Sequence, residues 1–248
     1  MEGFLLIDKP AGMTSHDVVD RLRRFTGTKT IGHAGTLDPF ATGLLLVGVG
    51  RTATREMQKL VGLNKEYEAT FVFGAMSDTD DKTGKITTGI GGISTDVGLE
   101  EKIQATLPSF TGNISQIPPA YAAIKIGGKK MYEAAREGKP LIAEPRNVHV
   151  DSFELTPSNR PTLQSSNHPL PVFSFRIACS SGTYIRALAR DLGAKLGVGS
   201  YVEELRRTNI GPFDVKKSVA LNVLSFEPWK RFLVPTEEIL AKIPTTGL

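Results

Sequence analysis

Residues 31–43 read IGHAGTLDPFATG, and the apolar run Leu44-Leu45-Leu46-Val47 follows at once. These thirteen residues hold three glycines, one histidine and one carboxylate, that of Asp38. Glycine lets the backbone turn sharply or approach another group closely, and Pro39 favours an extended backbone at the residue before it. The pattern predicts a shaped loop that presents one carboxylate and is anchored by a buried strand over 44–49. Functional groups are commonly carried on such loops, held by a rigid scaffold.

The composition is that of an ordinary globular protein. The 248 residues are 40% hydrophobic and 23% charged, and 30 basic residues against 26 acidic ones give a net charge of +4. This balance is compatible with a polyanionic partner but does not require one. Cys179 is the only cysteine, which excludes an intrachain disulfide and a cysteine metal cluster. The four histidines lack the paired spacing of zinc sites, so we expect neither a metal nor a cofactor.

Membrane and export signals are missing from the pattern. No apolar run approaches the ~20 residues that a membrane span needs. Asp8, Lys9 and Pro10 interrupt the only apolar stretch near the N-terminus, which is not typical of a signal peptide. We therefore expect a cytoplasmic protein that does not interact with membranes.

Hydrophobic periodicity predicts a mixture of strands and helices. Strands are expected at 4–7, 44–49, 67–73, 110–117, 122–126, 146–155, 173–179 and 202–208. Helices are expected after Thr14 (capped with Asp17 in a capping box), near 51–62, at 99–107 and 129–136, after Thr183 as cap, and briefly at 221–226 and 237–243. Steady alternation of strand and helix is lacking, so the pattern favours an α+β fold.

Three stretches predict loops. The acidic segment 77–84 does not have the spacing of a calcium loop, and a solvated turn is the better interpretation. The glycine-rich segment 89–98 predicts a linker, and 156–171, rich in proline, serine and asparagine, predicts a long surface loop. No internal repeat and no strong domain boundary is evident.

Loop chemistry alone would favour a plain turn aspartate at Asp38 and a solvated histidine at His33. The longer stretch around these two residues favours a functional role instead. GHAGTLDPFATGLLLVGVG (32–50) resembles, nearly letter for letter, the catalytic motif of the TruB family of tRNA pseudouridine synthases. Further strings resemble other family elements in the same order: LLIDKPAGMTS (5–15), KEY (65–67), IPPAYAAIK (117–125), CSSGTYIRAL (179–188) and LRRT (205–208). The likeness runs from about Leu5 to Phe213.

The resemblance implies a fold and a reaction. The fold is that of the pseudouridine synthases, a mixed and largely antiparallel sheet with flanking helices and loops around a central cleft. The reaction converts the uridine at position 55, in the T-loop of tRNA, to pseudouridine without a cofactor. The glycosidic N–C bond breaks, the base turns, and a C–C bond forms to the same sugar carbon.

The resemblance also implies roles for particular residues. Asp38 would be the catalytic carboxylate, acting either as nucleophile or as base toward the sugar. Arg186 would pair with it and keep it charged and oriented; the alternative is a surface arginine. Tyr67 would stack on the base and shuttle a proton, and Tyr184 would hydrogen-bond in the pocket; ordinary core packing is the alternative for both.

Further residues would bind the RNA. His33 would fill the space that the extruded base leaves, since base flipping costs a few kcal/mol and the gap needs support. Leu205 would form an apolar pocket wall. The candidate phosphate contacts are Lys9, Arg55, Lys129, Lys130, Arg206 and Arg207, and about half of them are expected to touch RNA. Asp81 resembles a family residue with a structural pairing role.

The domain plan follows from the same likeness. Residues 1–235 would form the catalytic domain, with an RNA-gripping insertion at about 117–143. Residues 236–248 would be a short tail without a full RNA-binding PUA domain. We expect a monomer that binds the T-arm stem-loop of tRNA without a guide RNA. Two other classes stay open: a non-catalytic RNA-binding protein on this scaffold, and a guide-RNA-dependent relative that modifies ribosomal RNA.

Overall fold

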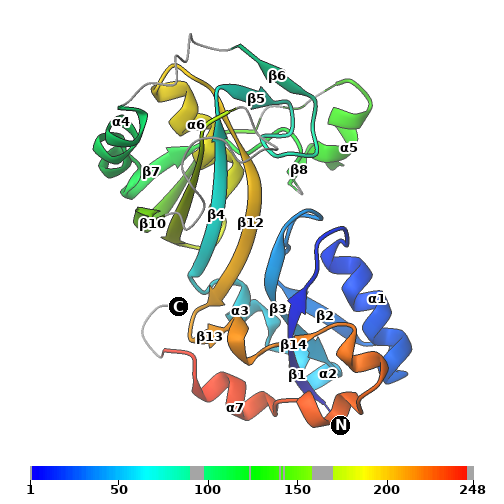
Figure 1. Ribbon diagram of the computed structural model, residues 1–248. Coiled ribbons are helices and arrows are strands. Elements are labelled where there is room, and N and C mark those ends of the chain that lie inside the picture. Colours follow the sequence, from blue (N-terminus) through cyan, green and yellow to red (C-terminus); the bar gives the residue numbers. More distant parts are fainter. Residues whose placement is uncertain are drawn as a thin grey trace. The chain divides into compact units, whose positions relative to one another are not determined.

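The computed structural model describes residues 2–89, 98–122, 124–139, 141, 143–157 and 170–244 (Figure 1). The chain forms two compact units. The first comprises residues 1–67 and 205–248, and the second residues 68–204. Both contain strands and helices, which confirms the α+β class. Most of the predicted loops at 89–98 and 156–171 lie outside the described residues.

The first unit is built on β1 (Gly3–Lys9) and β3 (Thr42–Val49), paired antiparallel along their whole length. β2 (Ile31–Ala34) pairs antiparallel with β3, so the predicted loop at 31–43 begins as a strand. β14 (Val219–Ala220) runs parallel to β1. The end of β12 (Ser200–Ile210) runs parallel to β3 and antiparallel to β13 (Phe213–Asp214).

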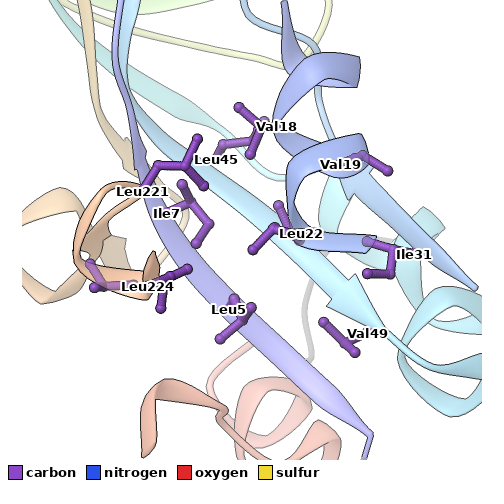
Figure 2. Packing of buried hydrophobic residues seen from close by; sticks show 12 residues of the cluster. Leu5, Ile7, Val18, Val19, Leu22, Ile31, Leu45, Val49, Leu221 and Leu224 are labelled. Atoms are coloured by element: carbon purple, nitrogen blue, oxygen red, sulfur yellow. The ribbon is translucent and has the colours of Figure 1, made fainter. Parts of the chain in front are cut away.

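β1 and β3 are buried on both faces, which explains their continuous apolar sequences. On one face Leu5, Ile7 and Leu45 pack against α1 (Ser15–Thr26), through Val18, Val19 and Leu22 (Figure 2). The predicted capping box is confirmed: the Thr14 hydroxyl accepts from the Asp17 N–H, and the Thr14 N–H donates to the Asp17 carboxylate. Burying each such aliphatic side chain contributes about 1.5–3 kcal/mol.

The opposite face of these strands presents Phe4, Leu6, Leu44 and Leu46. It is covered by α2 (Arg51–Arg55), α3 (Met57–Val61) and α7 (Thr236–Ala241), which contribute Ala53, Leu60 and Ile239. Residues 236–241 are thus part of the compact unit. The functional boundary predicted at residue 235 stays a prediction.

The second unit holds a sheet in the order β4 (Lys65–Phe73), β11 (Val172–Cys179), β10 (Arg146–Thr156) and β7 (Gly112–Gln116). β4 begins in the first unit. Aromatic rings from three neighbouring strands pack together: Phe71 and Phe175 have centroids 4.6 Å apart, and Phe153 lies 5.3 Å from Phe175. Such pairs add to the burial of area. The second unit also contains α4 (Leu99–Thr106), a 3₁₀ turn at Leu107–Phe110 and α6 (Ile185–Lys195) (Figure 1).

Two short hairpins lie in the second unit. β5 (Ala75–Ser77) pairs with β6 (Ile86–Thr88), and β8 (Lys125–Ile126) with β9 (Lys129–Lys130), which leads into α5 (Met131–Arg136). The helix predicted from Lys129 was wrong by two residues. Gly127 and Gly128 both have positive φ, the combination that closes a two-residue hairpin, so the two lysines pair as a strand.

Two further expectations need correction. Thr183 does not cap α6; the cap residue is Tyr184, while the Thr183 hydroxyl donates to the carbonyl of Ser180. Between residues 213 and 235 the chain forms three 3₁₀ turns, Val215–Lys217, Val223–Ser225 and Trp229–Phe232, and the short helix expected over 221–226 is one of them.

Gly43 offers a test of the packing between β3 and β12. Its φ is +103°, and a Cβ there would lie 2.2 Å from the carbonyl oxygen of Arg207. We expect Gly43→Ala to lower the free energy of unfolding by at least about 2 kcal/mol, from backbone strain and the clash together. Gly62 has no atom near its Cβ position, so Gly62→Ala should change stability by less than about 1 kcal/mol. Urea unfolding of both variants measures this, and equal stabilities would contradict it.

Candidate active site

The loop that carries Asp38 is held on both sides of this residue. Ser15, at the start of α1, accepts a hydrogen bond from the Leu37 N–H (2.9 Å) and donates to the Leu37 carbonyl (3.3 Å). On the other side, the Pro39 carbonyl accepts from the Gly12 N–H at 2.8 Å. The Asp38 carbonyl closes the turn by accepting from the Ala41 N–H. Leu37, Phe40 and Ala41 are buried, whereas Asp38 is partly exposed. The carboxylate is therefore presented from a fixed backbone.

Lys9 is buried beneath this loop. Its ammonium donates to the carbonyls of Pro10 (2.9 Å), Met13 (2.8 Å) and Pro39 (3.3 Å). Burial lowers the pKa of Lys9 to about 8, although the negative charge of Asp38 opposes this. The side chain is fully buried and its three donors are all engaged. The prediction that Lys9 contacts a phosphate is therefore wrong, and Lys9 is part of the loop's support.

The prediction that Arg207 contacts a phosphate is also wrong. Only 1% of the residue's surface is exposed, and its guanidinium donates to the carbonyls of Leu44 (2.8 Å) and Gly35 (3.0 Å). Like Lys9, it is a buried cation bonded to backbone, which leaves it unable to reach RNA.

The other candidate phosphate contacts differ in exposure. Arg206 forms a two-pronged pair with Asp8, with N–O distances of 3.0 and 2.8 Å, and stays half-exposed. Arg55 lies exposed on α2. The side chains of Lys129 and Lys130 lie outside the described part of the structure. For these four residues an RNA contact stays a prediction.

His33 lies on β2, partly buried. Burial lowers its pKa, and the positive charges of Arg207 and His16 lower it further, so its surroundings favour the neutral ring. Its buried Nδ1 has no hydrogen-bond partner among the described residues. His33 is thus a strand residue and not a loop residue.

Tyr67 and Leu205 lie where the sequence placed them, on strands. Tyr67 is in β4 with 8% of its surface exposed, and Leu205 is in β12 with 7% exposed. Both the pocket role and the core role accommodate such burial, so the pocket role stays a prediction.

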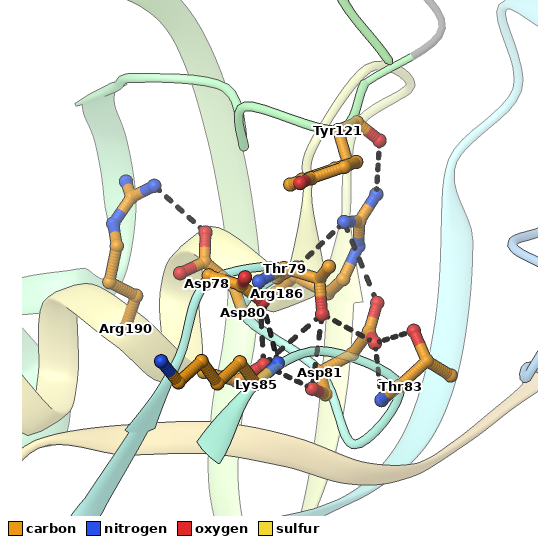
Figure 3. A network of polar contacts seen from close by, with 10 residues as sticks. Asp78, Thr79, Asp80, Asp81, Thr83, Lys85, Tyr121, Arg186 and Arg190 are labelled. Atoms are coloured by element: carbon orange, nitrogen blue, oxygen red, sulfur yellow. Dashed lines mark hydrogen bonds and ion pairs between the residues drawn. The ribbon is translucent and has the colours of Figure 1, made fainter. Parts of the chain in front are cut away.

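Arg186 belongs to the second unit and is not a surface arginine. Its side chain is 3% exposed, and the guanidinium donates to the carbonyls of Thr79 (2.9 Å) and Tyr121 (3.2 Å) and lies 3.6 Å from the Asp81 carboxylate (Figure 3). Asp81 in turn accepts from Thr79 and Thr83. The expected pairing role of Asp81 thus has a partner, Arg186. The solvated turn predicted at 77–84 is wrong because Asp81 is buried.

Gln116 is a site residue that the sequence analysis missed. It is buried, and its amide spans the backbone of Tyr184, accepting from the N–H (2.8 Å) and donating to the carbonyl (3.0 Å). It fixes the residue from which α6 begins, and so the placement of Arg186. The Tyr184 side chain packs beside Ala122 and Met131. A glutamine before the IPPAY string carried no signal for this contact.

Asp80 and Arg190 form a second arginine–aspartate pair in the same unit, with 3.1 Å between Nη1 and Oδ2. Burial raises the pKa of Asp80 to about 6, against the pull of Arg190 and Arg186. For Arg190, burial acts downward, but the Asp191 and Asp80 carboxylates outweigh it and raise the pKa. Both pKa values rise, but for different reasons: burial disfavours the charged form of Asp80, whereas two carboxylates favour the charged form of Arg190.

The predicted site residues divide between the units. Lys9, His33, Asp38, Arg55, Tyr67, Leu205, Arg206 and Arg207 belong to the first, and Lys129, Lys130, Tyr184 and Arg186 to the second. The pairing of Asp38 with Arg186 therefore stays a prediction. Among the described residues no group of histidine, cysteine and carboxylate ligands could hold a metal. No described helix is long and apolar enough to cross a membrane.

The raised pKa of Asp80 predicts a dependence of stability on pH. Its ionisation costs more in the folded state than in the unfolded chain, so its stabilising contribution is present at low pH and lost as the pH rises through about 6. Compared with Asp80→Asn, the wild type should lose about 2 kcal/mol of unfolding free energy between pH 4.5 and 8. Urea unfolding at both pH values measures this. Asp20→Asn, which alters an exposed carboxylate of α1, gives the baseline; a pH-independent difference for Asp80→Asn would refute the assignment.

Two solved structures share this fold. One chain of a Cbf5-Nop10-Gar1 complex matches with a TM-score of 0.65 and 29% identity, over 90% of this chain and 54% of that one. An H/ACA ribonucleoprotein bound to a substrate RNA containing 2′-deoxyuridine gives a TM-score of 0.67 and 26% identity, over 97% and 61%. This chain thus spans little more than half the length of those proteins.

Curated relatives are closer in sequence. The tRNA pseudouridine synthase B of Leifsonia xyli subsp. xyli is 44% identical over 235 residues, covering 95% of this chain and 75% of the relative. That of Opitutus terrae is 42% identical, covering 92% and 89%. Residues 23–185 match the model of the TruB family pseudouridylate synthase N-terminal domain, and residues 186–241 the tRNA pseudouridylate synthase B C-terminal domain. The chain belongs to the TruB family of pseudouridylate synthases.

Proposed function

We propose that this protein converts uridine to pseudouridine in tRNA, and that its target is the T-loop uridine at position 55. The observation that carries the proposal is the Asp38 loop: the family's catalytic string stands here intact, with its carboxylate partly exposed on a backbone fixed by Ser15 and Gly12. The relatives named tRNA pseudouridine synthase B, 42–45% identical, support tRNA as the substrate. We propose that neither a guide RNA nor a cofactor takes part, and that the protein acts as a cytoplasmic monomer.

The reaction is an isomerisation in which atoms and electrons balance within the nucleotide. The bond between the base nitrogen and the sugar carbon breaks, the uracil turns, and a ring carbon bonds to the same sugar carbon. The ring carbon that forms the new bond loses the proton it carried, and the former glycosidic nitrogen gains a proton. Asp38 acts as nucleophile or as base toward the sugar, and either role needs a charged carboxylate that is held in place.

The target base must leave the helical stack before a side chain can reach its sugar. His33 is suited to fill the gap, because a neutral planar ring can stack where the base stood. Tyr67 and Leu205 supply an aromatic and an aliphatic wall for the extruded base, and Tyr184 supplies a pocket hydroxyl. Arg186 pairs with Asp38 and holds it charged. Arg55, Arg206, Lys129 and Lys130 contact phosphates, with the two lysines in an RNA-gripping insertion over about 117–143.

Replacing the proposed catalytic carboxylate should abolish turnover and leave binding intact. Asp38→Asn keeps size and shape but cannot act as nucleophile or base, so we expect pseudouridine formation in a T-arm stem-loop to fall by about 10³-fold or more. Mass spectrometry of the RNA measures conversion, and a filter-binding assay measures retained affinity. The assay contains only protein and RNA, which separates this proposal from a guide-dependent enzyme. Undiminished conversion would rule out Asp38, and no conversion by the wild type would rule out the function.

The support beneath Asp38 can be tested separately. Ser15→Ala removes both hydrogen bonds to Leu37 and leaves a buried N–H unpaired. Because Asp38 follows directly, we expect kcat to fall about tenfold or more with a small change in KM. Ser225→Ala, at an exposed serine, is the matched control and should behave as wild type. An unchanged kcat for Ser15→Ala would show that the loop keeps its geometry without this contact.

A further inference from the structure

The segment 117–143 follows β7 directly, and hydrogen bonds tie residues 116–121 to α6 at three points. Gln116 binds the backbone of Tyr184, as described above. Arg190 donates from Nη2 to the carbonyl of Ile117 at 2.9 Å. Arg186 donates from Nη2 to the carbonyl of Tyr121 at 3.2 Å. Arg186 and Arg190 are one helical turn apart, so they project from the same face of α6.

Arg190 uses each of its three nitrogens for a different group. Nε donates to Asp191 at 2.8 Å, Nη1 to Asp80 at 3.1 Å, and Nη2 to the Ile117 carbonyl. The planar guanidinium therefore joins α6, the 77–84 turn and the start of the 117–143 segment in one rigid fork. Figure 3 shows the Arg190 and Asp80 side chains of this junction. A lysine could place a charge here but could not hold three acceptors in this geometry.

Asp80 is itself fixed. Its φ is +59°, the only positive value among non-glycine residues in the described part of the chain. Its N–H donates to the Ser77 carbonyl, and its carbonyl accepts from the Val202 N–H, both at 3.1 Å. A residue held in this uncommon conformation by its surroundings is a firm anchor. The Asp80 carboxylate can therefore orient Arg190, whose own side chain is 28% exposed.

We propose that Arg190 and Asp80 are positioning residues that orient the 117–143 segment for tRNA binding. The inference rests on the proposed function, in which this segment grips RNA. Without the Ile117 contact, the root of the segment keeps only Gln116 and Arg186 as side-chain holds among those described above. The segment then samples more orientations, and RNA binding must select the productive one at an entropic cost. The Asp38 loop belongs to the other unit, and Arg186 keeps its own contacts with Thr79, Tyr121 and Asp81, so the chemical step is spared once RNA is bound.

The test compares Arg190→Gln, Asp80→Asn and the double variant, with Arg190→Lys as the charge-preserving change. Arg176→Gln, at an exposed arginine of β11, controls for the loss of one positive charge. For each we would measure kcat and KM on a T-arm stem-loop, and the Kd of the same RNA by filter binding. We expect Arg190→Gln to raise KM and Kd about tenfold, the effect of one lost charge-assisted hydrogen bond, with kcat within about twofold.

The pair should act as a unit. Asp80→Asn should reproduce the rise in KM in part, the double variant should equal Arg190→Gln, and Arg190→Lys should not restore the wild-type KM. If Arg190→Gln fails to fold, Asp80→Asn and Arg190→Lys decide. Wild-type KM and Kd in these variants, or a loss of kcat alone, would overturn the inference. If the wild type does not convert uridine, the proposed function falls, and the Kd values still decide whether the pair orients an RNA-binding segment.

Discussion

The buried ammonium of Lys9 is the contact on which the arrangement of the catalytic loop depends. It ends β1 and satisfies three carbonyls at once, of which one, that of Pro39, follows Asp38 directly. Burying a cation is costly unless its hydrogen bonds are made, and here all three donors of the ammonium bind backbone carbonyls. The strand, the turn at 10–13 and the loop at 37–41 are thereby joined, and the family's first and second sequence strings become one structural element.

The second unit solves a related problem with arginines. Arg186 and Arg190 lie one turn apart on α6, and each combines a carboxylate from the 77–84 turn with a carbonyl from residues 117–121. The surroundings differ: Arg186 and Asp81 are almost fully buried, whereas Arg190 reaches solvent. Of the two carboxylates that Arg190 binds, Asp80 is less exposed than Asp191. The inner pair is almost fully buried, which suits a residue that must not move. The outer pair reaches solvent, which suits an anchor whose strength can vary.

The sequence predicted regular features well where local physics decides them. The capping box at Thr14 and Asp17, the apolar run at 44–49 and the alternating strand at 67–73 all depend on neighbours along the chain. The sequence-based prediction failed where a charged side chain is buried and bound to backbone carbonyls. From the sequence, Lys9 and Arg207 are predicted to be surface cations, yet both are buried. The acidic run containing Asp80 and Asp81 is predicted to be a solvated turn, yet Asp81 is buried. The Gln116 contact with Tyr184 spans 68 residues and leaves no local pattern.

The first unit is discontinuous along the chain, and this has a consequence for biosynthesis. Phe4 pairs through its backbone with Val234, and Ile7 with Val219, whereas residues 68–204 form a continuous unit. A ribosome adds about 5–20 residues per second, so β1 and β3 wait on the order of ten seconds or more for β12 and β14 to emerge. Until then these strands, apolar on both faces, present unpaired edges. The nascent chain is thus most exposed to misassociation before its scaffold for Asp38 is complete, and chaperone contact during that interval would protect the emerging active-site loop.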